Sequence, residues 1–127
     1  MLPSADQRYL DEKKLVYEEI PDEGMVHVVI RDFRMPAGYV PDTTDLLIKL
    51  PPGYPAAAPD MYWMKPAVRY ANGAYPPAAD QFMDIRGESW QRFSRHLQAS
   101  PWRPGVDGLA SYLLLIRHDL ESGVPSD

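Results

Sequence analysis

Prolines and glycines interrupt this chain so often that they limit the length of every regular element. Its 127 residues include 14 prolines and 8 glycines. Proline removes a backbone donor and glycine adds backbone freedom, so both residue types tend to lie at the ends of helices and strands. The chain can therefore be read as a series of short elements, each bounded by such residues.

Four short segments have the composition and spacing of β-strands. In the clearest of them, Val26, Val28 and Ile30 occupy alternate positions, as expected for one face of a strand. A turn signal at residues 21–24 (Pro-Asp-Glu-Gly) precedes this segment and predicts a hairpin. The four predicted strands cover residues 15–20, 25–33, 44–50 and 60–64. Together they predict a four-stranded antiparallel meander.

A helix pattern follows near the C-terminal end of the sequence. Apolar residues recur there at the spacing of one helix face, at Leu109, Tyr112, Leu113, Ile116 and Leu120. Asp107 is placed to cap the first turn of this helix. A shorter helix is predicted from Ser4 to Lys14, because Ser4 and Gln7 have capping-box spacing. The predicted fold class is α+β, with the longer helix covering the sheet.

The segment between Met64 and Ser94 contains no long periodic element. It includes the turn signals Asn-Gly at residues 72–73 and Pro-Pro at residues 76–77. A loop of this length inside a compact domain is usually functional or partly structured. The sequence therefore predicts that a site lies in or beside this segment.

Composition excludes several classes of function. The formal charge is -5 and there is no long run of Lys or Arg, so neither nucleic acid nor an anionic membrane is an expected partner. The sequence contains no cysteine, which excludes disulfides, Cys-ligated zinc and a thiolate nucleophile. Neither His27 nor His118 has partners at metal-ligand spacing. No metal or cofactor is therefore expected.

Length and hydropathy give two further expectations. A chain of 127 residues suits one domain with one core, which we expect to span residues 1–127. The first residues lack the basic and apolar regions of a signal peptide, and no segment reaches the roughly 18 apolar residues of a membrane span. These features predict a cytoplasmic location.

Three motifs follow one another in a recognisable order. The first is Leu-Ile-Lys-Leu-Pro-Pro-Gly-Tyr-Pro at residues 47–55, followed by Ala-Pro-Asp-Met-Tyr-Trp at residues 58–63. The second is Trp-Gln-Arg-Phe-Ser-Arg-His at residues 90–96, and the third is Trp-Arg-Pro-Gly-Val-Asp-Gly-Leu at residues 102–109. Their order resembles that in ubiquitin-conjugating (E2) domains, and in detail it is similar to the prokaryotic E2-like family E.

The resemblance implies a fold, a pathway and two partners. The implied fold is E2-like but lacks the last two helices of conventional E2 domains. The implied pathway is bacterial ubiquitin-like conjugation, and the implied partners are an E1-like adenylating protein and a ubiquitin-like modifier. In such a pathway the chain would carry the modifier between these partners and an acceptor.

The sequence departs from the E2 pattern at the positions that carry the chemistry. Ser94 stands eight residues before Trp102, where an E2 domain has its catalytic cysteine. The His-Pro-Asn motif that precedes that cysteine is replaced by Asp-Ile-Arg at residues 84–86, and the nearest asparagine is Asn72. Asn72 is therefore the available candidate for the supporting role of the E2 asparagine.

A serine carrier would hold the modifier as an oxyester and would need help to form it. A serine hydroxyl is unactivated near neutral pH, so a base must accept its proton within hydrogen-bond reach. His96 titrates in the right range and lies two residues after Ser94. In an extended segment these two side chains share one face. Asp107 is a candidate for orienting His96, although capping the helix is its more ordinary role.

Two other interpretations remain open at this point. The chain can be a catalytically inactive E2-like or RWD-like module that binds the E1-like protein or the modifier, or an unrelated small α+β binding domain. Ser94 with His96 favours the carrier, whereas the missing cysteine and His-Pro-Asn motif favour the inactive module. Trp90 and Trp102 are interpreted as packing residues, because tryptophan contributes a large buried area.

Overall fold

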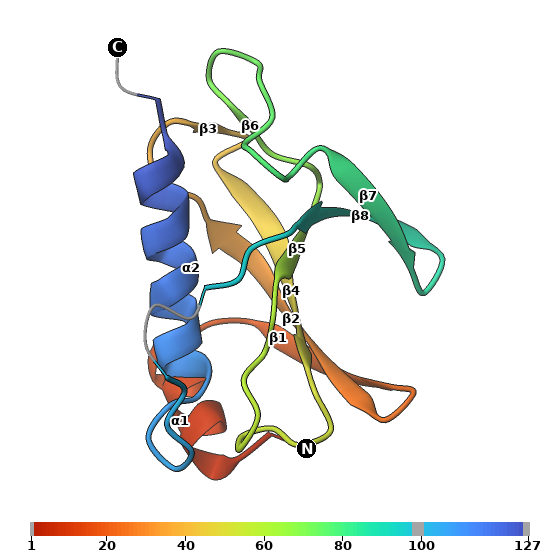
Figure 1. Cartoon of the computed structure of the whole chain (residues 1–127), viewed down its shortest axis with the longest axis vertical. Helices are drawn as coiled ribbons and strands as arrows, with labels where there is room; N and C mark the ends of the chain where they lie inside the picture. Colours follow the sequence, from red (N-terminus) through yellow and green to blue (C-terminus); the bar gives the residue numbers. More distant parts are fainter. Residues whose placement is uncertain (1, 98–100, 126–127) are drawn as a thin grey trace.

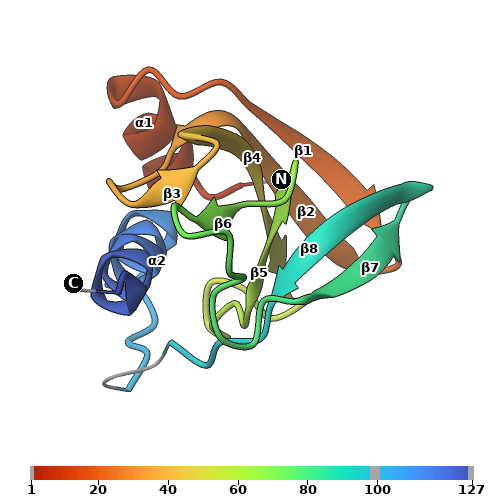
Figure 2. The same cartoon turned by 90° about the horizontal axis from the view of Figure 1, so that it is seen from above.

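A curved antiparallel sheet and a helix that lies across one of its faces make up most of the structure (Figures 1 and 2). The computed structural model describes residues 2–97 and 101–125. The two helices of these residues are α1 (Ser4–Glu12) and α2 (Leu109–Gly123). Their strands are β1 (Tyr17–Asp22), β2 (Met25–Arg34), β3 (Tyr39–Val40), β4 (Thr43–Leu50), β5 (Tyr62–Lys65), β6 (Arg69–Tyr70), β7 (Gln81–Ile85) and β8 (Glu88–Phe93).

The main sheet is larger than the predicted four-stranded meander. Its strand order is β1-β2-β4-β5-β8-β7, and every neighbouring pair is antiparallel. The first four of these strands correspond to the predicted meander, so the α+β class and its antiparallel sheet are confirmed. Strands β7 and β8 extend the sheet, and β3 pairs with β6 in a separate two-stranded sheet.

The segment between Met64 and Ser94, which was expected to be functional or partly structured, contains the short strands β6, β7 and β8. Residues 81–93 form the β7–β8 hairpin, whose turn has positive φ at Arg86 (53°) and Gly87 (83°). Two successive positive φ values are characteristic of the tight turns that connect antiparallel strands. Arg86-Gly87 was therefore a usable turn signal, although a weaker one than Asn-Gly.

Buried Gln91 explains why the hairpin has no simple apolar alternation. Its side chain donates hydrogen bonds to the carbonyl oxygens of Val68 (3.0 Å) and Ala79 (2.9 Å) and accepts one from the backbone N–H of Val68 (2.8 Å). A polar side chain thus occupies a fully buried position of β8 because it satisfies the backbone of the preceding loop. It joins residues 66–79 to the sheet.

Helix α2 packs its apolar face on the sheet as predicted. Leu109, Tyr112, Leu113, Ile116 and Leu120 are all buried in one cluster with residues of β2 and β4. On those strands the buried partners are Val28, Ile30, Leu46 and Ile48, with Val26 partly buried beside them. Two apolar faces of different period therefore cover each other.

Both predicted helix caps are wrong in detail. Helix α1 begins after Pro3, whose carbonyl accepts hydrogen bonds from Asp6 and Gln7, and no side chain caps it. Helix α2 begins after Gly108, and the carboxylate of Asp107 instead accepts a hydrogen bond from the backbone N–H of Arg103 (2.7 Å). That bond lowers the pKa of Asp107. Asp107 therefore stabilises the turn before the helix rather than the helix itself.

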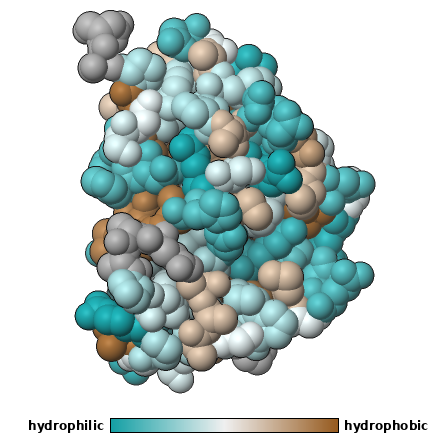
Figure 3. Space-filling view, viewed as in Figure 1, coloured by the Kyte–Doolittle hydropathy of each residue, from teal (hydrophilic) through white to brown (hydrophobic). Residues whose placement is uncertain are grey.

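The outer surface is mixed in character. Figure 3 shows mainly hydrophilic and weakly hydrophobic residues on the side seen in Figure 1, with small separate apolar areas. Among the residues described, none of the helices has the length and hydropathy needed to cross a membrane.

Candidate functional site

Ser94 lies immediately after β8, at the centre of a tight turn. The backbone N–H of Arg95 donates to the carbonyl of Phe93 (2.9 Å), so Ser94 is the middle residue of this three-residue turn. Its own N–H donates to the carbonyl of Ala78 (3.1 Å), and the carbonyl of Arg95 accepts from Met61 N–H (3.2 Å). Two neighbouring segments therefore fix the backbone around Ser94, whose side chain is half-buried.

His96 pairs with a carboxylate that the sequence analysis did not single out. Its Nδ1 lies 3.0 Å from Oδ1 of Asp60, and the two side chains are 81% and 51% exposed. A carboxylate at Nδ1 favours the tautomer in which Nδ1 carries the hydrogen and Nε2 is free to accept a proton. Asp60 thus orients the imidazole of His96.

No hydrogen bond joins the side chains of Ser94 and His96 among the described residues. Arg95 between them faces α2, where its Nε lies 3.7 Å from Oδ2 of Asp119. The Ser94–His96 pair therefore remains a prediction.

Beneath this segment, hydrogen bonds join the start of β5 to α2. The hydroxyl of Tyr62 on β5 donates to Oδ2 of Asp119 (2.5 Å), and Tyr112 on α2 donates to the carbonyl of Met61 (2.8 Å). Burial, followed by the bond to Asp119, raises the pKa of Tyr62 far above its ordinary range. Tyr62 is therefore a neutral structural donor and not a base.

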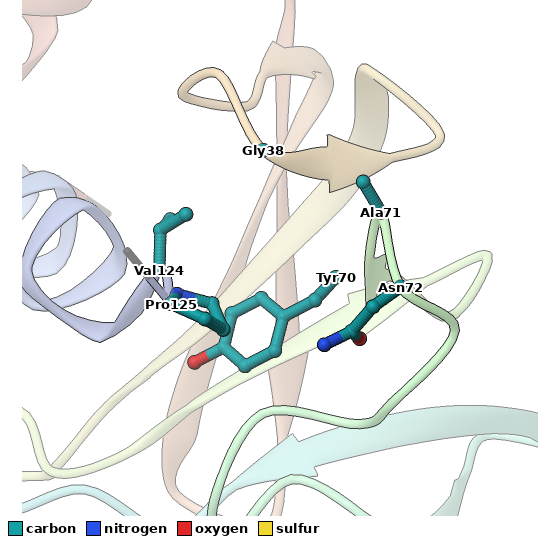
Figure 4. Close-up of a pocket in the computed structure, with 6 residues that line it drawn as sticks. All are labelled: Gly38, Tyr70, Ala71, Asn72, Val124 and Pro125. Atoms are coloured by element: carbon teal, nitrogen blue, oxygen red, sulfur yellow. The ribbon is translucent and has the colours of Figure 1, made fainter. Parts of the chain in front are cut away.

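Asn72 and Asp107 lie apart from Ser94 in their own local structures. The side-chain oxygen of Asn72 accepts a hydrogen bond from the backbone N–H of Ala74 (2.9 Å) in a surface turn. Asn72 lines a pocket of about 310 Å³ at the C-terminal end of α2, together with Gly38, Tyr70, Ala71, Val124 and Pro125 (Figure 4). Asp107 is held by Arg103, as described above. A supporting role for either residue in acyl transfer stays a prediction.

The two tryptophans of the motif have packing roles. Trp90 is 3% exposed and belongs to an apolar cluster on the face of the sheet away from α2. Trp102 donates its indole N–H to the carbonyl of Pro55 (2.8 Å), and its ring lies 6.3 Å from that of Tyr54. The Trp-x-Pro element is thereby fastened to the Tyr-Pro turn, which explains why the two motifs occur together.

No metal-binding group of three or more His, Cys, Asp or Glu residues occurs in the portion of the chain that the structure describes. The three histidines lie on separate elements, with His27 on β2, His96 after β8 and His118 on α2. The chemistry available near Ser94 is therefore that of a hydroxyl, an imidazole and a carboxylate.

The fold and the motifs around Ser94 define an E2-like protein, with an antiparallel sheet, a Tyr-Pro turn, Ser94 directly after the last strand and a covering helix. The chain belongs to Prokaryotic E2 family E, whose family model matches residues 2–123. No curated protein and no solved structure matches the chain. Membership of this family indicates a role in bacterial ubiquitin-like conjugation and interaction with components of such a pathway.

Proposed function

We propose that this protein carries a ubiquitin-like modifier as an oxyester on Ser94. It would accept the modifier's C-terminal acyl group from an E1-like adenylating protein and pass it to an acceptor. The observation that carries the proposal is the position of Ser94: it follows the last strand and precedes Trp102, which is fastened to the Tyr-Pro turn. In the E2 pattern that position belongs to the acyl carrier.

The proposed step uses Ser94, His96 and Asp60. The hydroxyl oxygen of Ser94 attacks the modifier's C-terminal carbonyl while Nε2 of His96 accepts the hydroxyl proton. The new bond is the Ser94 oxygen–carbon ester bond, and the bond that breaks joins the carbonyl to the E1-like carrier, whose leaving group receives the proton. Asp60, 3.0 Å from Nδ1 of His96, stabilises the imidazolium that forms.

The alternative is an inactive interaction module, and one observation favours it. Among the described residues, no hydrogen bond joins the side chains of Ser94 and His96, and His96 is largely exposed. In this case the chain would bind the E1-like protein or the modifier without forming a covalent bond.

The experiment that separates them identifies the atom that carries the modifier. The chain is incubated with its E1-like protein, the modifier and ATP, and the adduct is located by mass spectrometry. An ester on Ser94 would survive thiol reductants and be cleaved by hydroxylamine, whereas an amide on a lysine would resist both. Ser94→Ala should abolish the adduct; an adduct that forms equally fast on this variant would refute the carrier and support the module.

A further inference from the structure

The face of the sheet away from α2 carries a second apolar cluster. Its buried members are Val29, Leu47, Trp63, Ile85 and Trp90. Figure 2 shows how the β1–β2 and β7–β8 hairpins curve away from α2, so this face is concave. The cluster spans this face of the sheet from β2 to β7.

A groove of about 280 Å³ lies beside this cluster and shares Trp63 with it. Its lining is mostly apolar and includes three methionines, Met25, Met61 and Met83. The remaining lining residues are Lys49, Pro51, Ala58, Asp60 and Trp63. Methionine is flexible and polarisable, so such a groove can adapt to apolar side chains of different shape.

Two cations beside the groove lack the acidic partners that Arg31 and Lys65 of the same sheet have. The ammonium of Lys49 lies 4.4 Å from the centre of the Trp63 ring, and its hydrogen-bond partner is the sulfur of Met83 at 3.7 Å. Arg92 is directly opposite Trp63 in the β5–β8 pair, and its Nε is buried without an acceptor. In the described part of the chain, neither cation has a carboxylate within salt-bridge distance.

Two other cations of the sheet are paired with carboxylates. Arg31 contacts both Glu18 (2.6 Å) and Asp45 (2.7 Å), and Lys65 contacts Glu88 (2.6 Å). Burial lowers the pKa of Lys49, and Asp22 acts weakly in the opposite direction. Unpaired, partly desolvated cations are costly, and they are stabilised by an anion that approaches from outside.

The indole of Trp63 adds a third donor without an acceptor. Trp63 is 3% exposed, lines the groove, and its Nε1 is buried with no hydrogen-bond partner among the described residues. Weak or missing acceptors at Lys49, Arg92 and Trp63 make this region rich in donors. A ligand that matches it must bring acceptors, and carboxylates match best because two of the donors are cations.

We propose that this groove binds an extended acidic peptide segment of a partner protein, with an apolar side chain among the methionines and carboxylates at Lys49 and Arg92. Charge complementarity supports this occupant, because Lys49 lines the groove, Arg92 lies beside its Trp63, and neither cation has a salt-bridge partner among the described residues. Asp60, the acidic residue that lines the groove, is paired with His96.

The test measures peptide binding directly, without any conjugation reaction. The probe is a short fluorescein-labelled peptide of alternating glutamate and leucine, followed by fluorescence anisotropy, and the matched peptide has glutamine in place of glutamate. We expect the glutamate peptide to bind at least roughly 10-fold more tightly, and its affinity to fall with added salt. Equal affinity of the two peptides would overturn the proposal.

Variants of the protein locate the site. Lys49→Gln and Arg92→Gln should each lower the affinity for the glutamate peptide roughly 10-fold. Arg92→Lys keeps the charge and should retain most of the affinity. A loss seen only in Arg92→Gln would then not be due to misfolding. Arg8→Gln, on exposed α1, is the control for net charge. If Lys49→Gln and Arg8→Gln have the same small effect, the groove is not the binding site.

This inference does not rest on the proposed acyl transfer. Ser94→Ala should bind the glutamate peptide with unchanged affinity, even though it should form no oxyester. A variant set in which peptide binding is lost in Lys49→Gln but retained in Ser94→Ala supports the groove whatever the outcome of the conjugation assay. The two proposals can therefore fail separately.

Discussion

Asp6 caps helix α2 from a distance of 103 residues along the chain. Its Oδ1 accepts a hydrogen bond from the backbone N–H of Leu109 (3.1 Å), which is the first residue of the helix. Its Oδ2 accepts another from the hydroxyl of Tyr54 (2.5 Å). A buried carboxylate at a helix N-terminus is favoured by the helix dipole and satisfies a donor that the helix cannot. Asp6 thereby joins α1, the Tyr-Pro turn and α2.

Replacing Asp6 by Ala should lower the free energy of unfolding by about 2–4 kcal/mol, because one buried and one partly buried donor lose their acceptor. Chemical denaturation followed by circular dichroism measures this loss. Asp11→Ala, on the exposed side of the same helix, is the matched control and should change stability by less than about 0.5 kcal/mol. Equal effects of the two variants would show that Asp6 does not support α2.

The cap also explains why residue 108 is a glycine. A Cβ at this position would lie 2.7 Å from Oδ1 of Asp6. The glycine therefore leaves space for the carboxylate to approach the helix. Sequence analysis placed the cap at Asp107, the nearest acidic residue, because spacing along the chain carries no information about a carboxylate on another helix.

Because α2 packs on the sheet, truncating a buried side chain of this helix should lower the free energy of unfolding far more than truncating an exposed one. Ile116→Ala removes a side chain that is 0% exposed, so it should cost about 2–5 kcal/mol. Leu114→Ala, at a side chain that is 67% exposed on the same helix, should cost less than about 0.5 kcal/mol. Urea denaturation of both variants measures the difference. Similar losses would mean that α2 buries a different face.

Buried His27 should make stability depend on pH. Burial, reinforced by Lys49, lowers the pKa of His27 below its ordinary value, with Asp22 opposing the shift. The unfolded chain then binds the proton more readily than the folded chain. The contribution of neutral His27 is therefore fully present above the ordinary value of about 6.5 and is lost as the pH falls toward the lower folded value.

Unfolding measured at several pH values would show this dependence. His27→Gln should lose the part of the pH dependence that lies below about pH 6.5. His118→Gln, at an exposed position of α2, is the control and should keep it. A slope that is the same in all three proteins would rule out His27 as its source.

The sequence was sufficient to predict a helix or strand where one side of that element is uniformly apolar. The alternation at Val26, Val28 and Ile30 predicts β2, and the helical spacing from Leu109 predicts the face of α2 that is buried. It was insufficient for β8, because buried Gln91 breaks the alternation and satisfies backbone groups of a distant loop. A polar residue of this kind is indistinguishable from a surface residue until its partners are known.

The same limit applies to the candidate site. Ser94 was predicted from its spacing before Trp102 in the E2 pattern, and His96 from its place two residues after Ser94, since all three belong to one stretch of chain. Asp60 was missed because pairing of β5 with β8 brings it to His96, 36 residues away. The structure therefore adds one carboxylate to the predicted pair and leaves Asn72 and Asp107 in other surroundings.

The pairing of Asp60 with His96 gives the final prediction, which concerns the rate of oxyester formation. If His96 is the base, His96→Ala should slow the adduct on Ser94 by roughly 10²–10⁴-fold, as general bases usually do. Asp60→Asn should slow it less and should change the tautomer of His96, which the ¹⁵N chemical shifts of its ring report. Ser94→Cys should give a reductant-sensitive adduct that depends less on His96, because a thiol is already a few per cent thiolate near pH 7. Asp11→Asn is a matched exposed control and should leave both the rate and the ¹⁵N shifts unchanged. If Asp60→Asn alters neither, the exposed pair is incidental and Asp60 has no positioning role, even where Ser94 proves to be the carrier.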